Sequence, residues 1–208
     1  MVHISPRYKD TDFPHGRSLE QKIDIFEDQT LGWQIDVADV LINGCSGSPG
    51  VPDILPHPHA GYAVLSILVS YFEAIAKFQD GFTGEGCSKG YFKRGVRDVF
   101  PQLAEHPQCL VDEANDNLYR LVRCDLYHAA MTGTGVSISF GYPSPIAAVT
   151  DGKAWVLKLN PRKWPKPLRE HLCSYAGRLR DPSNARLRAN FEKRFDYLQQ
   201  PPSKPRKR

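Results

Sequence analysis

The sequence lacks an uninterrupted hydrophobic run long enough to cross a lipid bilayer. Its longest apolar stretch, residues 60–78, is interrupted by two serines, a glutamate and a lysine, whereas a membrane-spanning helix needs about 20 predominantly apolar residues. The N-terminal residues also lack the basic start and continuous apolar segment of a secretory signal. These absences predict a cytoplasmic protein that does not insert into membranes.

Cysteine pairs and enzyme signature motifs are also missing. The five cysteines are odd in number and include no Cys-x-x-Cys spacing, so we expect reduced thiols and no disulfide framework. His57 and His59 flank a proline in a loop, but two histidines fall short of the three or four ligands of a zinc site. The phosphate-binding loop, the dinucleotide fingerprint and the Gly-x-Ser-x-Gly motif are absent. The sequence therefore predicts no metal and no cofactor.

The chain does contain enough apolar residues to form a hydrophobic core. Its charged residues are unevenly distributed along the sequence. It has 208 residues, 41% of them hydrophobic, and no internal repeat. Residues 161–208 carry fourteen lysines and arginines against four acidic residues, a net +10, which leaves −6 for residues 1–160 out of the total of +4. This asymmetry predicts a polyanionic partner such as RNA. The alternative is a solvated basic helix pair with a disordered tail.

Helical periodicity predicts a first long helix over residues 18–43. Ser18 and Gln21 have the spacing of a capping box, and Asn43-Gly44 is a stop signal. The expected apolar row is Ile23, Phe26, Thr30, Trp33, Val37 and Leu41.

A second helix is expected over residues 59–79, apolar on three sides, and it should be the central core helix. Its one polar row consists of Ser66, Ser70, Glu73 and Lys77. One interpretation is a narrow solvated stripe with an ordinary Glu73–Lys77 pair. The other is a helix that lines a polar cleft with Glu73.

The rest of the chain predicts a change from helix to strand and back. Ser88 is expected to cap a short helix, and a third long helix begins near Leu110, with an apolar side formed by Ala114, Leu118, Leu121, Val122 and Leu126. Strand-like runs then surround Asp151-Gly152, a strong hairpin signal. Two helices follow, the first opened by Pro165 or Pro167 and the second running over residues 183–199.

The predicted fold is therefore mainly α: a helical bundle with a small antiparallel β-sheet inserted before two C-terminal helices. Five parts are expected: a flexible arm (1–17), a helical core (18–132), the sheet (133–160), a basic helical pair (161–200) and a disordered basic tail (201–208).

The segment Arg-Cys-Asp-Leu-Tyr-His, residues 123–128, places an arginine and a histidine late in the third helix. An arginine can hold a phosphate through a bidentate fork, and a histidine can take a proton near neutral pH and later return it. Together the two are sufficient for metal-free cleavage of RNA, which carries its own nucleophile in the 2′-hydroxyl.

This segment resembles the motif of the HEPN superfamily, helical nucleases in which four to six residues separate an arginine from a histidine. Arg123 and His128 have four residues between them, and the resemblance covers residues 18–132. It implies a metal-independent endoribonuclease that forms a homodimer, with Arg123 and His128 as catalytic residues. Family members often have a polar residue directly after the arginine, whereas this chain has Cys124 there and Asp125 next.

Structural interpretations of the same residues stay open. On a regular helix, positions five apart differ by about 140°, so Arg123 and His128 converge only if the helix is broken or a dimer combines two halves. His128 lies on nearly the same face as Leu121, as a core histidine would, and Arg123 could form an ion pair with Asp125 or Glu73. Cys124 and His128 have the spacing of a thiolate–histidine pair, although an inert buried cysteine fits as well.

Two functions are therefore carried forward. The first is a HEPN-like endoribonuclease, a bacterial toxin or defence protein with a neutralising protein partner, in which Asp125, Glu73 and Tyr127 support the catalytic pair. The second is a non-catalytic helical module that binds nucleic acid or protein. In both, the expected nucleic-acid-binding residues are Arg162, Lys163, Lys166, Arg178, Arg180, Arg186 and Arg188.

Overall fold

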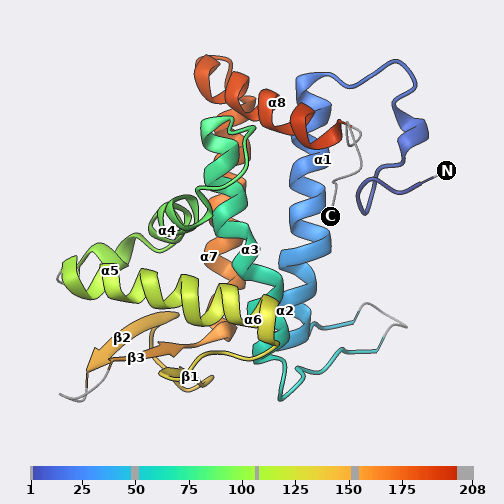
Figure 1. Cartoon of the computed structure of the whole chain (residues 1–208). Helices are drawn as coiled ribbons and strands as arrows, with labels where there is room; N and C mark the ends of the chain where they lie inside the picture. Colours follow the sequence, from blue (N-terminus) through green and yellow to red (C-terminus); the bar gives the residue numbers. More distant parts are fainter. Residues whose placement is uncertain (1, 48–51, 106–107, 151–154, 201–208) are drawn as a thin grey trace.

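The computed structural model describes residues 2–47, 52–105, 108–150 and 155–200 (Figure 1). The predicted mainly α fold with a small sheet and two C-terminal helices is confirmed. The α-helices are α1 (Leu19–Thr30), α2 (Asp36–Asn43), α3 (Gly61–Asp80), α4 (Ser88–Val99), α5 (Gln108–Asn117), α6 (Asp125–Ala129), α7 (Pro165–Arg180) and α8 (Ala185–Gln199). The strands are β1 (Val136–Ile138), β2 (Ile146–Thr150) and β3 (Trp155–Leu159).

The first long helix begins where the capping box places it. The Ser18 hydroxyl accepts a hydrogen bond from the Gln21 backbone N–H at 3.2 Å, and the Gln21 side chain accepts from the Ser18 N–H at 2.8 Å. The helix ends at Gly44, whose φ of +73° suits glycine. Between α1 and α2, however, Leu31–Ile35 form a π-helical segment.

This π-helical segment corrects the predicted apolar row beyond Thr30. A π turn adds one residue to the helix. The fully buried residues Ala38 and Ile42 accordingly lie one place beyond the predicted Val37 and Leu41, and Ile35 is fully buried within the segment itself. The residues predicted for these places instead face outward: Trp33 is 48% exposed and Val37 is 43% exposed.

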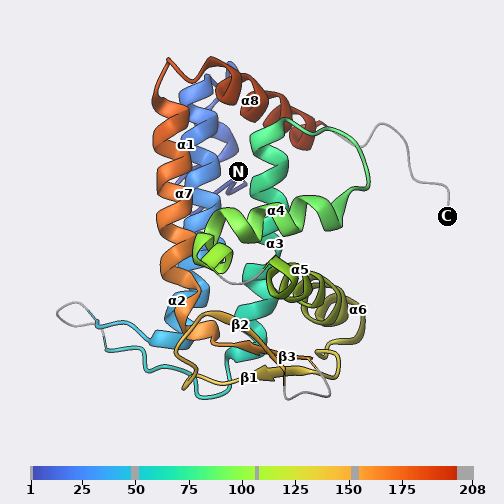
Figure 2. The same cartoon turned by 90° about the vertical axis from the view of Figure 1, so that its left-hand side faces the viewer.

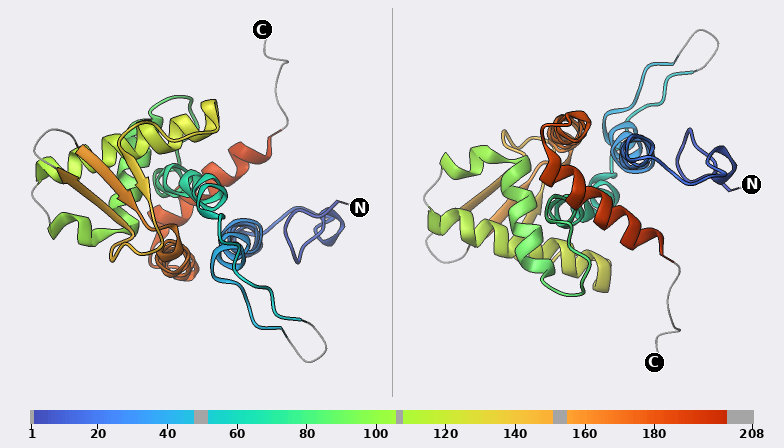
Figure 3. Two further views of the ribbon diagram at one scale, coloured as in Figure 1. Left: turned by 90° about the horizontal axis from the view of Figure 1, so that it is seen from below. Right: turned by 90° about the horizontal axis from the view of Figure 1, so that it is seen from above.

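Helix α3 is the central helix of the bundle, as its apolar sides predict. It lies between α1 and α4, α7 runs beside α1, and α8 crosses over the ends of α1, α3 and α7 (Figures 2 and 3). Eleven of its residues are buried. Among the described residues α3 alone has the length and apolar composition of a membrane-crossing helix, and 61% of its apolar window is buried inside the protein, as in the core helix of a soluble protein.

Ser88 begins α4 but does not cap it. The N-cap residue is Cys87, with φ of +57° and no side-chain hydrogen bond to the helix. The Ser88 hydroxyl instead donates to Glu73 of α3. The predicted capping role is therefore wrong, and the side chain belongs to the contact between two helices.

The third long helix is present, with a second irregular segment inside it. Residues Leu118–Cys124 are π-helical and join α5 to α6, and Ala130, with φ of +55°, ends α6. Of the predicted apolar side, Ala114, Leu118, Val122 and Leu126 are buried. The π-helical segment contains Arg123, so the helix is irregular at the motif.

The three strands form a mixed sheet, in the order β1-β3-β2. Strands β2 and β3 are antiparallel, with Ile146 opposite Leu159, as the hairpin signal predicts, although the Asp151-Gly152 turn lies outside the described residues. Strand β1 pairs with β3 in parallel, which corrects the expectation of a wholly antiparallel sheet. The sheet lies against α5 (Figure 3, left).

The C-terminal helices belong to the main core. Trp164, Leu172, Tyr175 and Phe191 are at most 1% exposed and join the same hydrophobic cluster as the residues of α1 and α3. The basic helical pair is therefore an integral part of the bundle. The expected tail, residues 201–208, lies outside the described residues.

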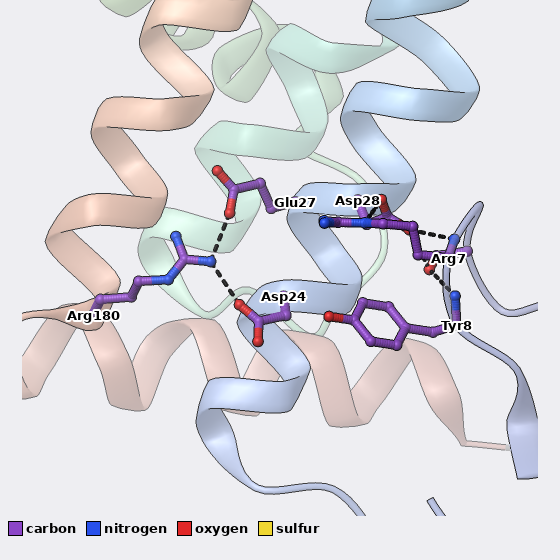
Figure 4. A network of polar contacts seen from close by, with 7 residues as sticks. Arg7, Tyr8, Asp24, Glu27, Asp28 and Arg180 are labelled. Carbon is purple, nitrogen blue, oxygen red and sulfur yellow. Dashed lines mark hydrogen bonds and ion pairs between the residues drawn. The ribbon is translucent and has the colours of Figure 1, made fainter. Parts of the chain in front are cut away.

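The N-terminal arm is anchored at its middle, contrary to the expectation of a loosely held segment. Asp28 of α1 accepts hydrogen bonds from the Ser5 hydroxyl at 2.6 Å and from the Arg7 backbone N–H at 2.8 Å, and it pairs with Arg7 Nε at 2.6 Å (Figure 4). Ser5 is fully buried. Because Pro6 also contacts Gly32 in the first π-helical segment, the arm covers the irregular part of that helix.

Candidate functional site

Arg123, the first residue of the motif, lies between a carboxylate and two aromatic rings. Its Nη2 is 3.0 Å from Glu73 Oε2, and its guanidinium lies 5.8 Å from the ring centroid of Tyr119 and 5.4 Å from that of Tyr127. The side chain is 27% exposed. Of the two ion pairs left open for Arg123, the one with Glu73 is therefore formed.

Glu73 contacts three other side chains at this site. Its Oε1 accepts hydrogen bonds from Lys77 Nζ at 2.6 Å and from the Ser88 hydroxyl at 2.8 Å, while its Oε2 faces Arg123. Burial by itself raises the pKa of Glu73, but the hydrogen bonds from Lys77 and Ser88, with the charges of Lys77 and Arg123, hold that pKa below its ordinary value. Glu73 is thus ionised at neutral pH.

These side chains line a cavity of about 200 Å³, which we call the Glu73 cleft. Its walls are formed by Ser70, Glu73, Ala74, Lys77, Arg123, Tyr127 and Arg194. The polar row of α3 therefore lines a cleft, and the interpretation as a solvated stripe is wrong: the side chains of Glu73 and Lys77 are only 13% and 11% exposed. With three cations and one carboxylate, the cleft has a surplus of positive charge and suits an anionic ligand.

His128 lies on α6 beyond this cleft. Its side chain is exposed and makes no hydrogen bond or ion pair with any residue that the structure describes. The core-histidine interpretation is therefore wrong. Tyr127, its neighbour, joins the site by donating from its hydroxyl to the Ser66 carbonyl at 3.1 Å and by contacting Arg123. Within one chain the structure thus groups Glu73, Arg123 and Tyr127 but leaves His128 outside their contacts.

The two residues after Arg123 have other neighbours. Asp125 is half-buried against Gly133, where an added Cβ would lie 2.7 Å from its Oδ2. Cys124 is half-buried, and together with burial it raises the pKa of the Tyr119 hydroxyl. Neither residue makes a hydrogen bond or ion pair with Arg123 among the described contacts.

Two of the expected nucleic-acid-binding arginines, Arg180 and Arg188, are already paired with acidic residues. Arg180 contacts Asp24 and Glu27 of α1, both at 2.6 Å (Figure 4). Arg188 pairs with Glu20 of α1 at 2.8 Å and also donates to the Leu179 carbonyl. These two arginines therefore neutralise acidic residues of the first helix, which corrects the expectation that Arg180 and Arg188 are free for RNA.

The other predicted basic residues lie elsewhere on the surface. Arg162 lies 4.9 Å from the ring centroid of Phe140, and Lys163 donates to the Pro143 carbonyl. Lys166 is 84% exposed, at 3.9 Å from Glu170. Arg178 and Arg186 line a larger cavity of about 800 Å³ at the junction of α3, α4, α7 and α8.

One further cation of the site, Arg194, could not be identified from the sequence. It lies 71 residues after Arg123 along the chain, on the basic helix α8, yet it lines the same cleft. Nothing in its local pattern separates it from the neighbouring Lys193, which is exposed. Only the crossing of α8 over α3 brings Arg194 to the site.

The pairing of Glu73 has a consequence for acid stability. Because its pKa is lowered in the folded protein, Glu73 contributes stability that is present above the unfolded-state pKa, about 4.3, and is lost as the pH falls through the folded-state value. We expect Glu73→Gln to lower the free energy of unfolding by about 1–3 kcal/mol at pH 7, somewhat less than breaking a fully buried pair. Urea unfolding of both proteins at pH 7 and pH 3 measures the difference, which should shrink at pH 3.

Glu170→Gln is the matched control for this prediction, because the Glu170 side chain is 66% exposed and its nearest lysine nitrogen lies 3.9 Å away. An exposed pair of this kind contributes little, so the control should match the parent protein at both pH values. A Glu73→Gln deficit of the same size at pH 3 as at pH 7 would contradict the assigned role of the ionised carboxylate.

The histidines that the structure describes do not form a recognisable metal site. The rings of His57 and His59 lie 6.1 Å apart, centroid to centroid, and the His57 Nδ1 accepts from the His59 backbone N–H. Among the described residues no group of three or more histidine, cysteine or acidic side chains is placed to hold a metal ion. The charged groups that the described structure brings together in the Glu73 cleft are Glu73, Lys77, Arg123 and Arg194. Comparisons with protein-family models, with curated proteins and with solved structures find no match for this chain.

Proposed function

We propose that this protein is a metal-independent endoribonuclease of HEPN type, in which Arg123 holds the scissile phosphate and His128 moves the proton. The observation that supports this proposal best is the position of Arg123. It lines a cleft with surplus positive charge, on a π-helical segment directly before the short helix that carries the exposed His128. Irregular helical turns of this kind occur frequently at functional sites.

The reaction needs no group beyond the RNA and these side chains. His128 accepts the proton of the 2′-hydroxyl, the 2′-oxygen forms a bond to phosphorus, and the bond from phosphorus to the 5′-oxygen breaks. The proton then passes from the histidine to the leaving 5′-oxygen. Arg123 stabilises the negative charge that develops on the non-bridging phosphate oxygens. The products are a 2′,3′-cyclic phosphate and a 5′-hydroxyl.

The contact with Glu73 leaves part of the Arg123 guanidinium available to an RNA phosphate. Only Nη2 of the guanidinium contacts Glu73 within the described part of the chain, and an arginine has five N–H donors. The carboxylate therefore orients the fork while other N–H groups can bind phosphate. Tyr127 supports the same orientation by stacking. Asp125 makes no contact with Arg123 in the described part of the chain that supports a comparable role.

The wider biological setting is part of the same proposal. As a HEPN-type nuclease the protein acts in the cytoplasm as a bacterial toxin or defence protein, forms a homodimer in which two motifs share one cleft, and is restrained by a neutralising protein partner. A dimer also supplies a second Arg123 to each His128. The alternative, a non-catalytic module that binds through the basic C-terminal helices, is less well supported, because Arg180 and Arg188 are engaged in ion pairs with α1.

RNA cleavage by the purified protein in excess EDTA tests this proposal. We expect cleavage to persist without metal and to yield 2′,3′-cyclic phosphate ends. Arg123→Lys should lower the cleavage rate by about 10²–10³, since a point charge cannot replace a bidentate fork at the developing negative charge. Arg97→Lys, at an exposed arginine of α4, is the control and should retain the parent rate. A strict requirement for Mg²⁺, or full activity of Arg123→Lys, would exclude the mechanism.

A further inference from the structure

Arg194 of α8 is a cation that the protein leaves incompletely satisfied. Its Nη1 donates to the Phe82 carbonyl at 2.7 Å, whereas its Nε–H is buried and has no hydrogen-bond partner among the described residues. Burial lowers the pKa of this guanidinium. A buried donor without an acceptor is costly, so the arrangement favours a bound molecule that brings an acceptor.

The neighbours of Arg194 favour an anion from outside the chain as its acceptor. Of the described residues that line the Glu73 cleft, only Glu73 carries a carboxylate, and its oxygens are taken by Lys77, Ser88 and Arg123. Lys77 has further partners in the rings of Phe82 and Tyr91, at 5.6 and 5.9 Å from its Nζ. Arg194 alone of the three cations has no ion pair with a described carboxylate.

We propose that Arg194 is a phosphate-binding residue of the RNA site, so that the Glu73 cleft holds a backbone phosphate between α3, the second π-helical segment and α8. This inference rests on the proposed ribonuclease function and adds the C-terminal helix to its substrate site. The cleft volume of about 200 Å³ is well above the roughly 10–15 Å³ that one water needs on the same measure, which leaves room for a phosphate group. Arginine is suited to this role because its planar fork matches phosphate oxygens.

Binding of a 2′-O-methyl oligoribonucleotide separates this role from catalysis, since the probe has no free 2′-hydroxyl and cannot be cut by the proposed mechanism. Arg194→Ala should weaken binding about tenfold or more through loss of a charge-assisted contact. It should also flatten the dependence of log K on log salt by about 0.7, the value for one phosphate contact on a single strand. The matched control is Lys193→Ala, which removes an exposed cation of the same helix and should change affinity less than about twofold. Equal losses in both variants would overturn the assignment.

The Nε–H signal of Arg194 provides a second measurement, in which binding is followed on the parent protein. We expect this NMR resonance, assigned by its loss in Arg194→Lys, to shift on titration with the 2′-O-methyl oligonucleotide. A signal that stays unchanged at saturating oligonucleotide would refute the inference. A shift with inorganic phosphate but none with the oligonucleotide would also refute it, in favour of a free-phosphate site.

The two proposals fail in different ways. If the parent protein binds the oligonucleotide through Arg194 but cuts no RNA, the ribonuclease proposal fails and the phosphate site stands. If RNA is cut in EDTA and the Arg194→Ala protein binds and cuts like the parent, the ribonuclease proposal stands and Arg194 is only a structural residue that holds the Phe82 carbonyl.

Discussion

His128→Ala is expected to lower the rate of RNA cleavage by about 10²–10⁴, the usual contribution of a general acid or base. The folded structure should be unaffected, because the side chain is exposed and makes no hydrogen bond or ion pair with a described residue. Binding of a 2′-O-methyl oligonucleotide should likewise change little, since the proposed phosphate contacts come from Arg123 and Arg194. Single-turnover cleavage with saturating protein measures the chemical step directly.

His15→Ala is the control for this experiment. His15 is also an exposed histidine, but it belongs to the N-terminal arm, so its removal tests the loss of an imidazole without touching the motif. The parent rate should be retained. If His128→Ala cleaves RNA within tenfold of the parent rate, another group transfers the proton, and the motif is only the structural end of a helix.

Gly95→Ala is expected to destabilise the fold by about 3 kcal/mol or more, at the upper end of the range for overpacked cores. A Cβ at Gly95 would lie 1.9 Å from the carbonyl oxygen and 2.6 Å from the carbonyl carbon of Phe72. Both atoms belong to the backbone of α3, which cannot move aside as the end of a side chain can. The two helices would have to separate, and Phe72 and Phe92, both fully buried, would lose their packing.

Gly90→Ala on the same helix is the matched control. A Cβ at Gly90 meets nothing within 4 Å, so the substitution should stabilise the protein by about 0.5–1 kcal/mol through helix propensity alone. Thermal and urea unfolding of the two variants should therefore shift in opposite directions. Similar shifts for both would mean that the close crossing of α3 and α4 is not what requires glycine at position 95.

Much of the secondary structure could be predicted because it depends on neighbours along the chain. The capping box at Ser18 joins groups three residues apart, and the pair of Glu73 and Lys77 joins side chains four residues apart. Strands β2 and β3, which are antiparallel partners, are only four residues apart along the chain. Interactions of this range leave a periodic pattern that local physical chemistry can interpret. The two π-helical segments escaped prediction because the residues before and after the added residue each keep helical spacing, so the buried row is displaced without a visible break in the pattern.

The sequence by itself determined the mainly α fold, the central position of α3 and the presence of the arginine–histidine motif. The tertiary structure decided what the charges do. Arg180 meets Asp24 across 156 residues and Arg123 meets Glu73 across 50, so which cations are neutralised and which line the Glu73 cleft depends on how the helices cross. The physical reason is that a charge interacts over a few ångströms of space whatever the separation along the chain, and only packing of the core brings those partners within that distance.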